Sequence, residues 1–371
     1  MNRRDFGIAV ASGVTGAALA NTTSLAQTRA TPRATQSASA KKKAAMFASA
    51  NGQATVEGMQ YVARHGVFHV DCNAPKTIPG VGWDYADAMQ QQEFCAKYNV
   101  KIESHHIPVH QSIMLGTPER DENIKQMQQM IEVAGKAGIR ALFYNTVLNG
   151  NLRTGFTGPD TKRGNVSYNT WDYQEALKRN EGLTEAGIVS VDTTFERIKY
   201  MLDRLIPVAE EYKVQLGNHP ADPATHEGYR GVTRWNSPDI FKGFQRFIAM
   251  YDSPYHGLNL CVGVTGESVK DPKTEVPPIV KWLGARNKLF NIHFRNIRGG
   301  WDHFMEVSVD DGDIDMVAVM RTLRDVGYPY GIQPDHTLRQ PDGGDSGAGR
   351  QYTAFVFGYI KALIAAVNSE T

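Results

Sequence analysis

Short runs of β-branched and aromatic residues alternate with longer amphipathic segments along most of the chain. The short runs predict strands over residues 67–70, 100–104, 140–145, 214–218, 258–262, 289–294, 304–307 and 330–333. Apolar residues at three- and four-residue spacing predict helices over 84–98, 118–137, 194–212, 238–251, 276–283, 314–326 and 349–367. Strands that alternate with helices are typical of a parallel sheet, and eight such units favour a closed barrel over an open doubly wound sheet. We therefore predict an α/β protein with a (β/α)8 TIM barrel.

The first 26 residues have the layout of an export signal. Arg3 and Arg4 precede a weakly apolar run over 7–20, and small residues at 24–26 offer a cleavage site. This order is typical of a twin-arginine signal and predicts an exported, periplasmic protein. Because Gly, Ser and Thr interrupt the short apolar run, we expect no stable membrane anchor after cleavage.

Residues 27–46 contain too few apolar side chains to bury a core, and they predict a flexible linker. Residues 47–371 are then expected to form the single barrel domain. Within it, residues 148–187 are rich in Gly, Asn, Thr and charge, which indicates a long insert between a strand and its helix. Such an insert would lie over the barrel mouth as a lid or as a contact in a homo-oligomer.

Composition and cysteine content exclude several classes of protein. The chain has 41% hydrophobic and 21% charged residues and a formal net charge of +1, so nothing in it calls for a nucleic acid partner. Three cysteines are an odd number and form no disulfide framework. Cys72 and Cys95 are expected as two separate buried thiols, with a bridge between them as the alternative.

Residues that bind metals follow four of the predicted strands. These residues are His219, Cys261, His293 and Asp335. In a parallel barrel the carboxyl ends of all strands face one mouth, so these four side chains should converge there. Taken singly, a strand His or Cys is more often a core residue and an Asp a helix cap, but four at equivalent positions favour a metal site. The thiolate favours Fe²⁺, Zn²⁺ or Mn²⁺ over Mg²⁺.

Around these positions the sequence resembles the mannonate dehydratases of hexuronate breakdown. The resemblance runs from about Val100 to the C-terminus and is carried by an ordered set of motifs: Glu103-Ser104-His105-His106-Ile107-Pro108-Val109, Tyr144-Asn145, Arg153-Thr154, Asn218-His219-Pro220-Ala221-Asp222-Pro223, Gly257-Leu258-Asn259-Leu260-Cys261-Val262-Gly263, His293-Phe294-Arg295-Asn296, Gly312-Asp313-Ile314-Asp315-Met316 and Pro334-Asp335-His336. The resemblance implies a barrel of the xylose-isomerase type and Mn²⁺ or Fe²⁺ on the four ligands, with Zn²⁺ as the alternative. It also implies that a small sugar acid, D-mannonate, loses water to give 2-keto-3-deoxy-D-gluconate.

That reaction needs a base for the C2 proton, an acid for the departing 3-hydroxyl and a cation near the carboxylate. His336, next to a ligand, is the first candidate for a proton-transfer group, and Tyr352 is the second. Arg295 is placed to clamp the substrate carboxylate, with a structural ion pair as its alternative role.

Three further residues are expected to bind substrate. Asn145, His105 and Arg153 all follow or lie near predicted strand ends. His106 shares this position with His105, and the alternative for either histidine is a place in the core or behind the metal ligands.

Two other functions remain open on the sequence alone. A metal-dependent sugar isomerase or epimerase could use the same barrel, since it also removes a proton at C2. A sugar-acid binding protein without catalysis is the weaker alternative, because such proteins usually close two lobes around a hinge, and the sequence shows no such division.

Overall fold

The computed structural model describes residues 43, 45–336, 338–341 and 350–370, which belong to one unit running from Lys41 to Thr371. The predicted export signal and nearly all of the predicted linker lie outside the described residues.

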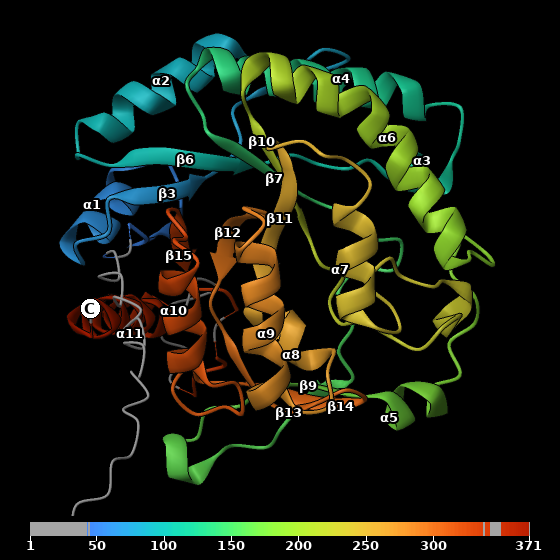
Figure 1. Ribbon diagram of the computed structural model, residues 1–371, viewed down its shortest axis with the longest axis vertical. Coiled ribbons are helices and arrows are strands. Elements are labelled where there is room, and N and C mark those ends of the chain that lie inside the picture. The colour runs from blue at the N-terminus through green and yellow to red at the C-terminus, as the bar shows by residue number, and fades with distance from the viewer. Residues whose placement is uncertain (1–42, 44, 337, 342–349, 371) are drawn as a thin grey trace, which may run out of the picture. The chain divides into compact units, whose positions relative to one another are not determined.

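The described residues contain one large parallel sheet that closes into a barrel. Its strands, in sheet order, are β1 (Phe47–Ala48), β15 (Gly331–Gln333), β12 (Leu289–His293), β11 (His256–Cys261), β10 (Gln215–His219), β7 (Ala141–Asn145), β6 (Lys101–His106), β3 (His69–Cys72) and β2 (Ala50–Gly52). Only Ser49 separates β1 from β2, and β1 pairs with β15 while β2 pairs with β3. The segment 47–52 thus joins the two edges of the sheet, which confirms the predicted TIM barrel (Figure 1).

One predicted barrel strand is wrong. Residues 304–307 belong to β14 (His303–Val307), which lies in a separate antiparallel sheet with β13 (Asn296–Gly300), β9 (Asn169–Asp172) and β8 (Gly155–Phe156). The place in the barrel is taken by 47–52, whose sequence Phe-Ala-Ser-Ala-Asn-Gly lacks β-branched residues and so carries little strand signal. Asp302, with a φ of 73°, allows the tight turn between β13 and β14.

Helices surround the barrel, and the long ones lie at the predicted places except the first, over residues 56–64, which was not predicted. The long ones are α1 (Val56–Arg64), α2 (Tyr85–Ala96), α4 (Arg120–Lys136), α6 (Val191–Tyr212), α7 (Ile240–Ile248), α9 (Pro272–Gly284), α10 (Met316–Asp325) and α11 (Arg350–Ser369). Shorter elements are β4 (Thr77–Ile78), β5 (Gly82–Trp83), α3 (Gln111–Leu115), η1 (Thr161–Arg163), α5 (Tyr173–Lys178), η2 (Tyr229–Gly231) and α8 (Val262–Glu267). Side chains of Asp84, Ser190, Asp239 and Asp315 accept hydrogen bonds from backbone N–H groups in the first turns that follow them, which fixes where α2, α6, α7 and α10 begin.

The barrel interior is filled at the end opposite the predicted metal ligands. Phe143 of β7 packs with Phe290 of β12, although two other strands separate them in the sheet. Beneath them the Arg140 guanidinium lies 3.9 Å from the centre of the Tyr330 ring and donates to Glu103 at 3.1 Å. Because these side chains fill the interior at this end, the described part of the barrel presents its interior to a ligand from the carboxyl ends of its strands.

The last helix, α11, is long and apolar, and one of its faces is buried. By length and composition alone, α11 could cross a membrane, with a mean hydropathy of 1.2. One of its faces, which includes Val356, Phe357 and Ile360, is buried within the described part of the chain, where α11 packs on α10 and β1.

Residues 148–187, the expected insert, contain β8, η1, β9 and α5. Through β9 this segment joins β14, and its Arg153 pairs with Asp222 and Glu306 at the end of the barrel where the predicted metal ligands lie. All three cysteines are free, buried thiols.

Candidate active site

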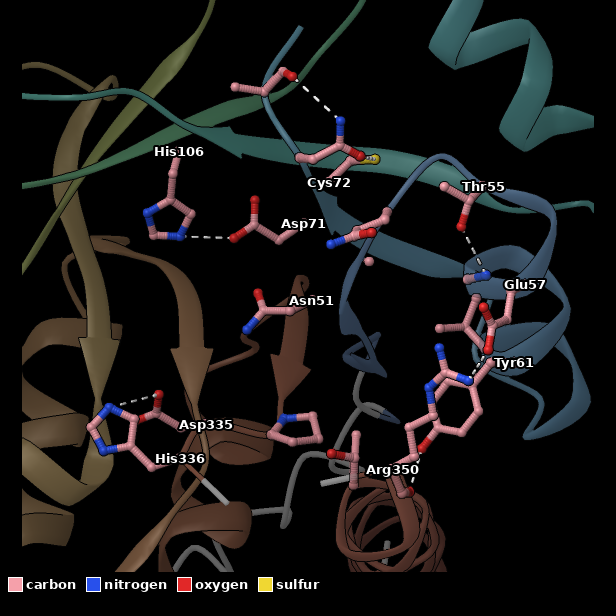
Figure 2. Close-up of a pocket in the computed structure, with 18 of the residues that line it drawn as sticks. Asn51, Thr55, Glu57, Tyr61, Asp71, Cys72, His106, Asp335, His336 and Arg350 are labelled. Atoms are coloured by element: carbon pink, nitrogen blue, oxygen red, sulfur yellow. Dashed lines mark hydrogen bonds and ion pairs between the residues drawn. The ribbon is translucent and has the colours of Figure 1, made fainter. Parts of the chain in front are cut away.

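The carboxyl ends of the barrel strands border a cavity of about 940 Å³. Asp71 and His106 line it from the ends of β3 and β6, and Asp335 and His336 line it from the segment after β15. Figure 2 shows these two pairs facing the same space from different sides, with Asn51 between them. The volume lies within the range usual for small-molecule sites, so the cavity can hold a sugar acid.

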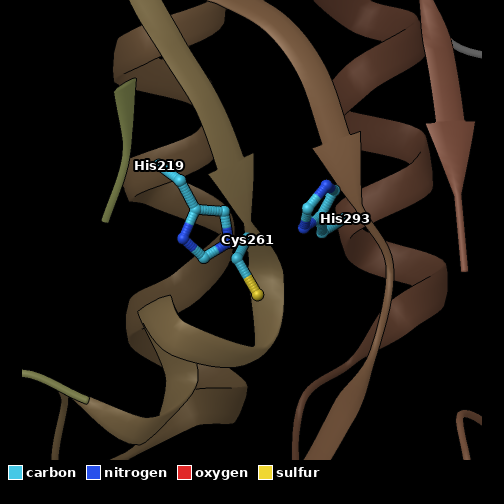
Figure 3. Close-up of side chains that lie close together, drawn as sticks. All are labelled: His219, Cys261 and His293. Atoms are coloured by element: carbon cyan, nitrogen blue, oxygen red, sulfur yellow. The ribbon is translucent and has the colours of Figure 1, made fainter. Parts of the chain in front are cut away.

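Three of the predicted ligands meet at this end of the barrel. His219 ends β10, Cys261 ends β11 and His293 ends β12, and Cys261 and His293 are register partners. One ligand atom from each lies within 4.8 Å of the others, and Figure 3 shows the two imidazoles on either side of the thiol. The fourth predicted ligand is next to them, because Asp335 Oδ2 lies 3.2 Å from Cys261 Sγ and Asp335 Oδ1 lies 3.5 Å from His293 Nδ1.

His219 presents a neutral nitrogen to the cluster. Its Nδ1 lies 2.8 Å from the carbonyl oxygen of Pro220 and donates to it, which leaves the lone pair of Nε2 free to bind a metal. Burial, together with the neighbouring His293, lowers the pKa of His219 to about 3. The ring is therefore in the state that a metal needs at neutral pH.

His293 is held by two amides. Its Nε2 lies 3.2 Å from Asn259 Nδ2 and 3.0 Å from Gln333 Nε2. Its Nδ1 is buried and makes no hydrogen bond in the described part of the chain, although Asp335 is close. A buried ring nitrogen without a hydrogen-bond partner, next to the Asp335 carboxylate, fits a metal ligand when the two amides present their oxygens to Nε2, because Nε2 then carries the proton of the ring.

Cys261 has two roles in the structure. It is the last residue of β11 and the N-cap of α8, where its sulfur accepts a hydrogen bond from Val264 N at 3.3 Å. Burial raises the pKa of the thiol well above its usual value, and the Arg295 guanidinium opposes this rise. Because only the thiolate binds a metal, binding here would release a proton.

The donor set fits a divalent metal of the soft or intermediate kind. Two imidazole nitrogens, one sulfur and one carboxylate from four separate strand ends are the number and type of ligands that Zn²⁺, Fe²⁺ or Mn²⁺ accepts. Asp335 completes the set as an anion, because burial alone would raise its pKa but His336, His293 and Arg295 together lower it well below the usual value.

A buried network of charges supports Asp335. Arg295 donates to Asp335 Oδ2 at 2.8 Å, to Asp222 Oδ2 at 3.1 Å and to Glu267 Oε1 at 2.5 Å. The guanidinium packs so closely on Gly263 that a Cβ there would lie 2.5 Å from its side chain. With its donors on protein carboxylates, Arg295 holds Asp335, the fourth predicted ligand, in place, which corresponds to the structural alternative for this residue.

Arg153 belongs to the same network. It donates to Asp222 at 2.7 and 3.1 Å and also pairs with Glu306, while Glu267 lies 3.5 Å away. Burial would lower the pKa of Arg153, but these carboxylates raise it. The structure therefore brings Arg153 to the site as a partner of protein carboxylates, and its contact with substrate stays a prediction.

His336 lies where a proton-transfer group is needed. Its Nδ1 is 2.6 Å from Glu306 Oε1 and its Nε2 is 3.8 Å from Asp335 Oδ1. Asp335 raises its pKa to about 9 against the effect of burial, with Glu306 adding to the rise. Since its side chain is 35% exposed, the ring can reach a ligand in the cavity.

Two other predicted residues, Tyr352 and His105, make their contacts away from the four predicted ligands. The Tyr352 hydroxyl accepts a hydrogen bond from Val309 N at 2.9 Å and lines a separate hollow with Arg163 and Asp310. His105 is buried, with Nδ1 3.1 Å from Cys72 O and its ring against Trp83. Their roles in proton transfer and substrate binding stay predictions that the geometry does not favour.

Asn145 lies closer to the ligands. It is the register partner of His219 on the neighbouring strand, and its side chain is exposed at the strand end. This position is compatible with the predicted contact to substrate.

Sequence reasoning missed several residues of the site. Like the predicted ligands, Asp71 lies at the carboxyl end of a barrel strand, one residue before the end of β3. It was missed because this strand was predicted to end at Val70. Asp222 stands in the motif after His219, and Glu306 lies in the strand that was wrongly placed in the barrel. The motif could have suggested Asp222, whereas nothing in the local sequence indicates that Glu306 faces His336.

Comparison with known proteins finds similar sequences and similar folds. The sequence pattern of the D-mannonate dehydratase (UxuA) family matches residues 46–161 and 167–371. The mannonate dehydratase of Thermotoga maritima is 28% identical over 291 residues, which is 69% of this chain and 78% of that protein. The mannonate dehydratase of Streptococcus pneumoniae is 27% identical over 287 residues, which is 70% of this chain and 76% of that protein.

Solved structures share the barrel. The crystal structure of mannonate dehydratase from Streptococcus suis serotype 2 superposes with a TM-score of 0.72 at 24% identity, covering 87% of this chain and 95% of that one. D-psicose 3-epimerase from Clostridium cellulolyticum H10 superposes with a TM-score of 0.55 at 10% identity, covering 86% and 99%. At these identities the structures show the fold, a barrel of the xylose-isomerase type.

Proposed function

The chain belongs to the D-mannonate dehydratase family, and we propose that D-mannonate is its substrate and 2-keto-3-deoxy-D-gluconate its product. Family membership makes it a sugar-acid dehydratase, which is a carbon-oxygen lyase. The observation that carries the finer proposal is the convergence of His219, Cys261, His293 and Asp335 beside a cavity that also receives His336.

The chemistry of dehydration accounts for this arrangement. The proton at C2 lies next to a carboxylate, so its removal places further negative charge on an anion. A divalent ion held by the four ligands would supply a Lewis acid that offsets this charge. We propose Mn²⁺ or Fe²⁺ for this place, with Zn²⁺ as the alternative, because the sulfur ligand disfavours Mg²⁺.

Within this proposal His336 takes the C2 proton. Its Nε2 is turned towards the ligand Asp335, while its Nδ1 is fixed by Glu306. A positive charge bound by Asp335 would oppose the effect that now raises the pKa of His336, and so favour the neutral ring that a base requires. Arg295 acts as a positioning residue, because it holds Asp335 and Glu267 together.

Metal analysis combined with product detection tests the proposed function. We expect about one divalent ion per chain and release of a 2-keto-3-deoxy acid from D-mannonate, detected by a thiobarbiturate assay. Dialysis against a chelator should abolish turnover, and Mn²⁺ or Fe²⁺ should restore it. Formation of an epimer without loss of water, or turnover that survives complete metal removal, would contradict the proposal.

The cellular compartment of the protein is the subject of a separate proposal. We propose that the chain is exported to the periplasm, which is supported by the arginine pair, the apolar run and the small residues of the first 26 positions. Replacing both Arg3 and Arg4 by Lys should leave the protein in the cytoplasm with its first residues uncleaved. Equal amounts of the altered and the original protein in the periplasmic fraction would contradict export by this route.

A further inference from the structure

A second histidine and carboxylate pair borders the cavity away from His336. His106 ends β6, and its Nε2 lies 2.8 Å from Oδ2 of Asp71, which lies one residue before the end of β3. Both residues line the cavity that also contains Asp335 and His336. In Figure 2 the His106 and Asp71 pair stands above this space and the His336 and Asp335 pair below it.

The environment of the two residues differs sharply. The Asp71 side chain is only 2% exposed, whereas that of His106 is 46% exposed. Apart from this ion pair, neither carboxylate oxygen of Asp71 has a hydrogen-bond partner among the described residues. A buried carboxylate with no other direct partner favours a neighbouring cation, so Asp71 stabilises the protonated form of His106.

This pairing leaves a donor for a ligand. Since Nε2 faces Asp71, Nδ1 is the ring nitrogen that remains, and within the described ranges no protein atom bonds to it. The edge of the ring lies against Phe143, with ring centres 5.8 Å apart and an interplanar angle of 72°, which limits how the imidazole can turn. His106 thus offers an N–H into the cavity at a fixed place.

We infer that His106, held by Asp71, donates the proton to the hydroxyl group that leaves C3, while His336 acts at C2. The inference rests on the proposed dehydration and assigns a catalytic residue to it. In this role His106 replaces Tyr352, the second proton-transfer group predicted from the sequence. The Tyr352 hydroxyl is bound to the backbone of Val309, and Tyr352 lines a separate hollow.

The step balances in atoms and electrons. As the C2 proton is removed, the electron pair of the C2–H bond forms the C2=C3 bond and the C3–O bond breaks. The departing oxygen takes the proton from Nδ1 of His106 and leaves as water. The enol then becomes the 2-keto product by moving its hydroxyl proton to C3 through solvent, and the two histidines exchange protons with water to return to their starting states.

Several charged or titratable groups act on His106. They are Asp71 on β3, His105 on its own strand, His219 on β10, His293 on β12 and Asp335 after β15. Burial lowers the pKa of His106, but Asp71 and, more weakly, Asp335 raise it above the usual value. An acid must be protonated to act, so the catalytic rate should fall as the pH rises through this pKa.

Two variants of the full chain, loaded with metal, test the inference. His106→Asn should keep its metal and lower kcat with D-mannonate by roughly 10²- to 10⁴-fold, the usual contribution of a positioned acid. With the 3-deoxy-3-fluoro analogue of the same acid, whose fluoride leaves with less help from a proton, the variant should stay within about tenfold of the original protein. Asp71→Asn retains the imidazole and should move the alkaline limb of the kcat profile to lower pH.

A matched control and the opposite results complete the test. His303→Asn changes an exposed histidine of β14 that lies outside the cavity, and its kinetics should equal those of the unaltered protein. A His106→Asn protein that is unimpaired, or equally impaired with both substrates, would overturn the inference. An unchanged pH profile in Asp71→Asn would do the same, even if His106→Asn failed to fold. If the unaltered protein forms no 2-keto-3-deoxy acid from D-mannonate, the proposed function fails first, and this inference with it.

Discussion

A Cys261→Ser protein is expected to fold normally but to bind its divalent metal at least about 100-fold more weakly, with a matching loss of dehydratase activity. Serine can replace the N-cap hydrogen bond that the sulfur now accepts from Val264 N, so α8 should still begin at the same residue. What the substitution removes is the thiolate, the ligand that favours a soft metal over Mg²⁺.

Metal titration of the purified protein measures this effect, and circular dichroism checks the fold. Cys95→Ser is the matched control, because it changes a buried thiol of α2 that lies outside the cluster and should leave metal affinity unchanged. Metal affinity and activity that are equal in Cys261→Ser and the unaltered protein would show that the sulfur is not a ligand.

Replacing Arg295 by Gln should cause the largest loss of stability among substitutions at the site. The guanidinium is 3% exposed and bonds directly to Asp222, Glu267 and Asp335. Removing one partner of a buried ion pair leaves uncompensated charge and typically costs about 3 to 5 kcal/mol of unfolding free energy. Since Asp335 also loses the contact that orients it, metal affinity should fall by at least about tenfold.

Denaturant unfolding in the presence and absence of metal measures both effects. The control is Arg298→Gln, because this arginine is 42% exposed and pairs with Asp311 near the surface, where such pairs contribute at most about 1 kcal/mol. Arg295→Lys should restore part of the stability but not the full metal affinity, since an ammonium group cannot reproduce the planar contacts to several carboxylates. If Arg295→Gln matched the control in stability and metal affinity, the supporting role of the network would be wrong.

The convergence of the four proposed ligands could be predicted because its signal is local. Each of His219, Cys261 and His293 directly ends a strand that is apolar enough to recognise, and Asp335 follows one closely. Once a parallel barrel is assumed, strand ends converge whatever the details of packing. The same rule would have found Asp71 if the predicted strand had included it.

Other features depend on tertiary contacts that leave little trace in the sequence. Residues 47–52 form a barrel strand because β15 and β3 offer them partners, not because of strand propensity. Arg295 was expected to meet the substrate, but its four carboxylate neighbours come from distant segments, so only the folded chain shows that its donors are already used. His105 and His106 look alike in sequence, and the pleat of β6 decides which of the two reaches the cavity.

The account depends above all on one divalent ion being bound by a thiolate, two imidazoles and a carboxylate at the mouth of the barrel. X-ray absorption spectroscopy of the metal in the purified protein measures this directly. We predict one sulfur neighbour at about 2.3 Å, if the metal is Zn²⁺, together with nitrogen and oxygen neighbours at about 2.0 to 2.2 Å. A spectrum with oxygen neighbours alone and no sulfur would contradict it.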